Sequence, residues 1–108
     1  SLFTAGVSAA EAGQSVQTLF LNVSDFTEMS GTQQEELAKT TAVLNELGVN
    51  ADNTAKNLQF ATKTLGMTTT EATKLQRELF TFAQNLGVSA DKIAQDFQKF
   101  GPQIAALG

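Results

Sequence analysis

The motif Leu86-Gly87-Val88-Ser89-Ala90 decides the fold of this chain, because its pattern recurs along the sequence. The pattern is glycine, an aliphatic residue, a small residue that can cap a helix, and then alanine or threonine. Four segments contain it: Gly6-Val7-Ser8-Ala9, Gly48-Val49-Asn50-Ala51, Gly66-Met67-Thr68-Thr69 and Gly87-Val88-Ser89-Ala90. Leucine precedes the last three glycines, and the pair recurs as Leu107-Gly108. These leucines lie 18 or 21 residues apart, which indicates a repeat of about 20 residues.

Each part of the motif has a physical role at a helix boundary. Glycine often ends a helix because it adopts the left-handed backbone conformation without a Cβ clash. The aliphatic residue can fold back onto the last helical turn, and Ser, Asn or Thr then caps the next helix. We therefore expect helix-breaking turns at Gly6, Gly48, Gly66 and Gly87. The alternative is one long helix, in which each glycine would cost about 1 kcal/mol relative to alanine.

The segments between the motifs carry apolar residues at helical spacing. Capping boxes with the pattern S/T-x-x-E predict helices that begin after Ser8, Thr32 and Thr68. Residues 24–31 are the most loop-like segment. The spacing places Val16 on the inner face of the first helix and Leu47 on that of the second.

The fifth helix should begin at Ser89 and end at Gly101-Pro102, because the residue before proline avoids the helical region. Pro102 would then open a short sixth helix carrying Ile104 and Leu107.

These patterns predict an all-α fold, since no strand pattern of useful length is present. We expect about five short helices, joined by tight turns that contain glycine and arranged as a helical bundle or a stacked helical repeat. Residues 1–31 form an N-terminal helix and loop, and residues 32–108 form a helical repeat module. The two parts are expected to make one compact unit.

Charge is distributed unevenly along the 108 residues, and the net charge is −4. Residues 1–38 contain five acidic residues and no Lys or Arg, whereas residues 39–108 have a net charge of +1. Neither part is a basic patch, which weighs against binding to nucleic-acid phosphates or anionic lipid. No apolar run approaches the roughly 18 residues of a membrane span, so none is expected.

The residue types needed for common catalytic sites are missing. The sequence has no His and no Cys, so it offers neither a thiolate zinc site nor a histidine base. Its acidic residues mostly occupy first helical turns, where they favour the helix dipole. We therefore expect no enzymatic activity, no metal site and no cofactor.

One wide apolar face is predicted in the last two long helices. Its residues recur at spacings of three and four and are Leu75, Leu79, Phe82, Leu86, Ile93, Phe97 and Phe100. This face is wide enough for a neighbour on each side, so we expect the chain to bind its own copies. Phe60 lies off the alanine-rich stripe of the third helix, where it either packs on a neighbouring helix or contacts a partner.

Residues 82–100 also resemble the turn of a helix-turn-helix DNA-binding module, in which Ala precedes Leu-Gly-Val-Ser. The would-be recognition helix contains Asp91 and Asp96 against Lys92 and Lys99, and no Arg to bind guanine or phosphate. The same turn recurs elsewhere in the chain, so architecture explains it better. DNA binding, or a generic role in protein–protein interaction, remains an alternative.

Residues 47–108 resemble segments of phage tail tape measure proteins. The resemblance lies in Leu65-Gly66-Met67-Thr68-Thr69-Thr70-Glu71-Ala72 and in Leu86-Gly87-Val88-Ser89-Ala90-Asp91-Lys92-Ile93-Ala94. Such proteins are long and mostly helical, lie inside the tail tube, set tail length during assembly and leave ahead of the DNA at infection.

This resemblance implies a fragment of a longer virion protein, made in the host cytoplasm. It also implies assembly into trimers or hexamers and contacts with tail tube or baseplate proteins, without specific binding of nucleic acid. The chain departs from the family's long heptad rods, because its helices break about every 20 residues.

Overall fold

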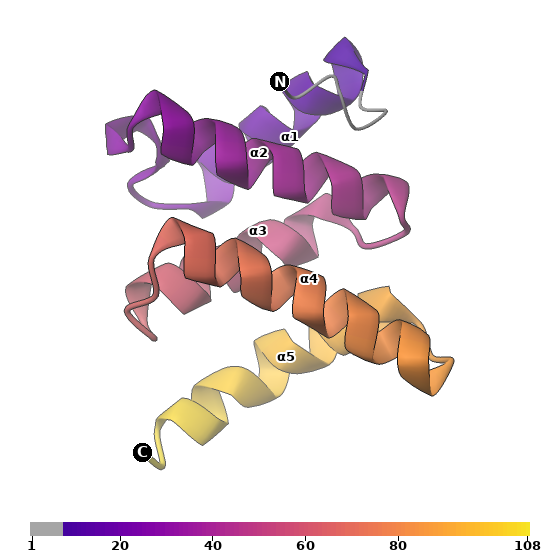
Figure 1. Cartoon of the computed structure of the whole chain (residues 1–108). Helices are drawn as coiled ribbons and strands as arrows, with labels where there is room; N and C mark the ends of the chain where they lie inside the picture. The colour runs from indigo at the N-terminus through magenta and orange to yellow at the C-terminus, as the bar shows by residue number, and fades with distance from the viewer. Residues whose placement is uncertain (1–7) are drawn as a thin grey trace.

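The computed structural model describes residues 8–108, which form five α-helices and one turn of 3-10 helix without a strand. This confirms the all-α prediction. The elements are α1 (Ala9–Asn22), η2 (Phe26–Glu28), α2 (Gly31–Glu46), α3 (Ala51–Lys63), α4 (Thr69–Leu86) and α5 (Ala90–Ala105) (Figure 1).

The helices stack in two layers. One layer contains α1, α3 and α5, and the other contains α2 and α4 (Figure 1). Each helix packs against the next helix in the chain and against the following helix of its own layer. This is the contact pattern of a stacked helical repeat. The two ends of the stack are therefore α1 and α5.

Three of the four predicted glycine turns are described by the structure, and all three have positive φ. The φ angles are 99° at Gly48, 68° at Gly66 and 71° at Gly87, while Gly6 lies outside the described residues. After Gly87, the N–H of Val88 donates to the carbonyl of Ala83 at 3.0 Å, the backbone bond of a Schellman motif. The glycines therefore separate helices.

The residues after these turns cap the next helix as predicted. The side chains of Ser8, Asn50, Thr68 and Ser89 each accept a hydrogen bond from a backbone N–H in the first turn. The prediction of a cap at Thr32 was wrong. Ser30 caps α2, and Gln33 completes its capping box. Gln can replace Glu in this motif, so the true box lies two residues earlier than the predicted one.

The prediction of a break at Gly101-Pro102 was also wrong. Helix α5 continues through Pro102 to Ala105, and no separate sixth helix is present among the described residues. The clash that normally bends a chain before proline involves the preceding Cβ atom, which Gly101 lacks. The proline ring fixes φ near the helical value, so α5 accommodates Pro102 at the cost of one hydrogen bond and of crowding against the preceding turn.

The main core joins both predicted parts of the chain. It contains buried residues of α1, η2, α2, α3 and α4: Leu19, Val23, Phe26, Leu37, Ala38, Ala55, Leu58, Ala61 and Ala72. Two predicted inward residues lie outside it, because Val16 is 40% exposed and Leu47 is 53% exposed. At the α2–α3 turn, Val49 is buried instead, since the residue after the glycine folds back onto the helix.

Within residues 8–108, no helix combines the length and the apolar character required to cross a membrane.

Candidate interaction surface

The predicted apolar face lies on α4 and α5 at the end of the stack, and only part of it is buried within the chain. Leu75 packs against the main core, and Leu79, Ile93 and Phe97 are partly buried. Phe82 is 52% exposed, Leu86 58% and Phe100 46%. The structure thus leaves the turn-proximal half of the α4 stripe, and the outer edge of α5, in contact with solvent.

Three further residues extend this exposed surface. Val88 lies in the α4–α5 turn, and Ile104 follows Phe97 and Phe100 at helical spacing on the continued α5. Leu107 follows the end of that helix. We define the α4/α5 apolar face as the six exposed residues Phe82, Leu86, Val88, Phe100, Ile104 and Leu107. Sequence reasoning separated Ile104 from this face, because it placed Ile104 on a sixth helix.

Phe60 packs against α5. Its ring lies 5.7 Å from that of Phe97, centroid to centroid, with an interplanar angle of 71°. A Cβ atom at Gly101 would lie only 3.0 Å from Cε2 of Phe60. Phe60 therefore fills the space left by the missing side chain of Gly101, and intramolecular packing accounts for its position.

A row of polar contacts joins α3 to α5 on the side of α5 that faces into the stack. Asn53 Nδ2 donates to Asp91 Oδ1 at 2.9 Å, Gln98 Nε2 donates to Asn53 Oδ1 at 2.7 Å, and Asn57 Nδ2 donates to the carbonyl of Ala94 at 3.0 Å. We call Asn53, Asn57, Asp91 and Gln98 the α3–α5 polar ladder. The contacts Asn50–Asp91, Asn57–Ala94 and Phe60–Phe97 advance along both helices in the same direction, so α3 and α5 run parallel.

Asp91 is the charged centre of this ladder. The Asn53 side chain, together with the backbone N–H of Asn50 and the side chain of Gln95, lowers the pKa of Asp91, although partial burial opposes the shift. A carboxylate that accepts several N–H groups is favoured in its charged form. Asp91 therefore anchors the start of α5 to the start of α3.

The ladder was not predicted from the sequence, although a signal was present. Asn50, Asn53 and Asn57 are spaced by three and four residues, so they share one face of the third helix. Asparagine on the inner face of a helix needs polar partners, because an unpaired buried polar group is costly. That spacing indicated a polar helix–helix contact.

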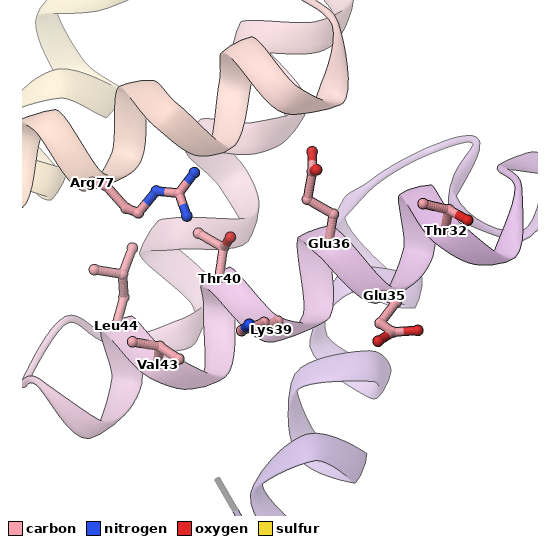
Figure 2. Close-up of a pocket in the computed structure, with 8 residues that line it drawn as sticks. All are labelled: Thr32, Glu35, Glu36, Lys39, Thr40, Val43, Leu44 and Arg77. Atoms are coloured by element: carbon pink, nitrogen blue, oxygen red, sulfur yellow. The ribbon is translucent and has the colours of Figure 1, made fainter. Parts of the chain in front are cut away.

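A hollow of about 500 Å³ lies between α2 and α4. Figure 2 shows Arg77 reaching from α4 towards α2, where Glu36 and Thr40 line the other side. Thr70 and Thr73 donate long hydrogen bonds to Glu36, of 3.4 and 3.5 Å. The charged lining residues are two acidic and two basic: Glu35, Glu36, Lys39 and Arg77. This balance provides no net attraction for either an anion or a cation.

The opposite end of the stack is acidic. Glu11 of α1 lies against Glu46 at the end of α2, and a hydrogen bond and charge repulsion from Glu11 raise the pKa of Glu46. Residues 8–38 contain five acidic side chains and no basic one. The two ends of the stack therefore differ in charge, since the α1 end is acidic whereas α4 and α5 carry equal numbers of acidic and basic residues.

Residues 82–100 form a helix, a tight turn and a second helix, as both the repeat and the DNA-binding alternative predict. The side of α5 with Asp91 and Gln98 faces α3. On the remaining surface, Lys92 pairs with Asp96 at 2.8 Å, and Lys99 Nζ lies 5.3 Å from the centre of the Phe100 ring. Both lysines of the would-be recognition helix thus have partners within α5.

Comparisons with protein family models, with curated proteins and with solved structures found no match for this chain. Its function is therefore inferred from its own geometry and sequence pattern.

Proposed function

We propose that this chain is a structural segment of a phage tail tape measure protein. In this role it binds its own copies and the tail tube or baseplate proteins around it. It would be made in the host cytoplasm, become part of the virion, and contribute to tail length determination, assembly and genome ejection.

The α4/α5 apolar face is the observation that carries this proposal. Its six large apolar side chains are between 46% and 89% exposed and lie on two adjacent helices and the turn that joins them. Contiguous apolar patches of a few hundred Å² on a protein surface mark sites of interaction. A stacked helical repeat also presents such a face wherever no further helix covers it. A protein that assembles with others through helical contacts uses a surface of this kind.

The proposal is tested through the length of the tail. Codons for residues 66–86, one repeat of 21 residues, would be deleted or duplicated in a phage that carries the gene. Tail lengths would then be measured by electron microscopy. A helix rises 1.5 Å per residue, so each change should shift tail length by up to about 30 Å, in opposite directions. Mass spectrometry of purified tails would locate the protein.

A variant that keeps the chain length serves as the control. Gln84→Ala alters an exposed position of the same repeat without changing the number of residues, so tail length should stay unchanged. Unaltered tails after both deletion and duplication, or absence of the protein from purified tails, would contradict the proposal.

A further inference from the structure

We infer that the α4/α5 apolar face is a two-fold contact, in which the same face of a second copy covers it. The inference deepens the proposed self-association and rests on it, because it names the surface and the symmetry. In such a contact, Phe82 and Leu86 of one copy lie near α5 of the other, and the reverse holds by symmetry. The acidic α1 ends then point away from each other.

The exposed area is adequate for a stable dimer. If each of the six side chains exposes its fraction of the roughly 150–200 Å² typical of a large apolar side chain, the face presents on the order of 600 Å². A standard interface removes about 800 Å² from each partner, of which roughly 60% is apolar. The apolar surface at this end is therefore of the size that one such interface uses.

The charges of α4 and α5 permit the face to meet itself. The two helices carry four acidic and four basic residues: Glu71, Glu78, Asp91 and Asp96, with Lys74, Arg77, Lys92 and Lys99. Two identical faces that each carried an excess of charge of one sign would repel each other, whereas faces with equal numbers of acidic and basic residues avoid this cost. Lys92 and Asp96 already neutralise each other on α5.

The other exposed apolar residues of the chain do not form an equivalent surface. On α1, Val16 is 40% exposed, Phe20 60% and Leu21 73%; Val16 and Phe20 lie four residues apart on one face, and Leu21 points about 100° away from Phe20, so this surface has three large apolar side chains against six on the α4/α5 apolar face. The three α1 residues also belong to the segment with five acidic and no basic residues. Two α1 ends would repel, and an α1 end gains no net attraction from the charge-balanced α4/α5 end. Pairing between two α4/α5 faces is therefore the favoured contact.

The experiment places charge towards both ends of the face, at Leu86 beside the α4–α5 turn and at Ile104 near the end of α5. Leu86 and Ile104 are exposed in the single chain, so polar substitutions there should leave its fold intact. The whole chain, the double variant Leu86→Glu/Ile104→Glu and the double variant Leu86→Lys/Ile104→Lys would be studied by analytical ultracentrifugation. We expect a dimer for the unaltered chain at tens of micromolar. We also expect a dissociation constant at least about 30-fold higher for each double variant.

An equimolar mixture of the two double variants tests the symmetry. When a face that carries glutamates meets a face that carries lysines, the dimer should form again. In a head-to-tail contact, the α4/α5 apolar face of one copy would meet α1 of the next. Since α1 is unaltered in both variants, mixing them would not restore such a contact. The matched control is Phe20→Glu/Leu21→Glu, which alters equally exposed residues of α1 and should leave the dimer unchanged. Circular dichroism would verify that every variant stays helical.

Several results would overturn the inference. They are a monomeric unaltered chain at 100 µM, a trimer or hexamer, dissociation by the α1 control, or failure of the mixture to pair. None of these results bears on whether the protein is present in tails or sets tail length. The virion experiment therefore tests the proposed function separately.

Discussion

Asp91 on α5 accepts a hydrogen bond from the side chain of Asn53 on α3, with 2.9 Å between Asn53 Nδ2 and Asp91 Oδ1. The same carboxylate oxygen accepts the backbone N–H of Asn50 at 2.8 Å, and Gln95 donates to the other oxygen at 2.9 Å. One side chain thus joins the start of α3 to the start of α5, which the sequence separates by 38 residues or more.

Asp91→Asn should reduce the free energy of unfolding by about 1–2 kcal/mol at pH 7, because hydrogen bonds to a charged acceptor are stronger than neutral ones. The pKa of Asp91 is lower in the folded chain than its ordinary value of 3.8. Its stabilising contribution is therefore present above that value and is lost as pH falls through the folded pKa. Urea unfolding should show a difference between the variant and the unaltered chain at pH 7 that shrinks as the pH falls below 3.8 and through the lower pKa of the folded chain.

Asp96→Asn is the control for this prediction, since Asp96 pairs with the exposed Lys92 on the same helix. An exposed pair of this kind contributes about 0.5 kcal/mol or less. Equal losses of stability from the two substitutions at pH 7 would show that the contact between Asp91 and α3 contributes no more than an exposed ion pair does.

Alanine substitutions at two glycines should change stability in opposite directions. Gly87 has a φ of 71°, so Gly87→Ala should destabilise the chain by about 1 kcal/mol or more. Gly13 lies inside α1, and a Cβ atom there would meet nothing within 4 Å. Gly13→Ala should therefore stabilise by up to about 1 kcal/mol. Thermal unfolding distinguishes the two, and a rise in melting temperature for Gly87→Ala would contradict the turn.

Gly101→Ala should destabilise the chain, although alanine is the better helix former. The added Cβ would lie 3.0 Å from Cε2 of Phe60, whose ring is held edge-on by Phe97. Overpacking of this kind costs about 1–3 kcal/mol, which outweighs the helical gain of about 1 kcal/mol. In a Phe60→Leu background, which removes the offending atom, the same substitution should become stabilising. Chemical unfolding of the four chains would measure this coupling, and additive effects would argue against the contact.

Duplex DNA should not bind detectably at physiological salt, even at tens of micromolar protein. Non-specific DNA binding comes from basic side chains that displace counterions. The chain has a net charge of −4, and Lys92 and Lys99 already have partners within α5. A fluorescence anisotropy titration at low and moderate salt provides the measurement. Salt-sensitive micromolar binding that disappears in Lys92→Glu/Lys99→Glu would favour the helix-turn-helix alternative instead.

The sequence predicted the helix boundaries best where a local rule determines them. Gly48, Gly66 and Gly87 all adopt positive φ, since few other residues tolerate that conformation. Ser89 and Thr68 cap their helices for an equally local reason. Thr68 and Glu71 form the capping box of α4, in which the backbone N–H and the side chain of Thr68 hold the pKa of Glu71 below its usual range. Such interactions span only a few residues.

The sequence failed where contacts between distant helices decide the outcome. A local rule ends α5 at Pro102, but Gly101 lacks the Cβ atom that would clash, and Phe60 of α3 packs against it. The α3–α5 polar ladder likewise depends on α3 and α5 being parallel neighbours, which no local sequence pattern predicts. The candidate surface was predicted in part: Phe82, Leu86 and Phe100 belong to it, whereas Ile104 was assigned to another helix.

The two-layer stack has a mechanical consequence. Because each helix packs mainly on the next helix and on the following one, tension applied at the end of α5 would peel the helices away one after another, from α5 back towards α1. Helix α5 would detach first, since it lies at the end of the stack and has a single buried residue, Ala94, and since the polar ladder and the packing of Phe97 on Phe60 are what hold it to α3. In that ladder, Asn57 leaves a buried carbonyl oxygen without a hydrogen-bond partner, which weakens the grip on α5 further. In the proposed role, a chain built in this way would be drawn out through a narrow passage one helix at a time.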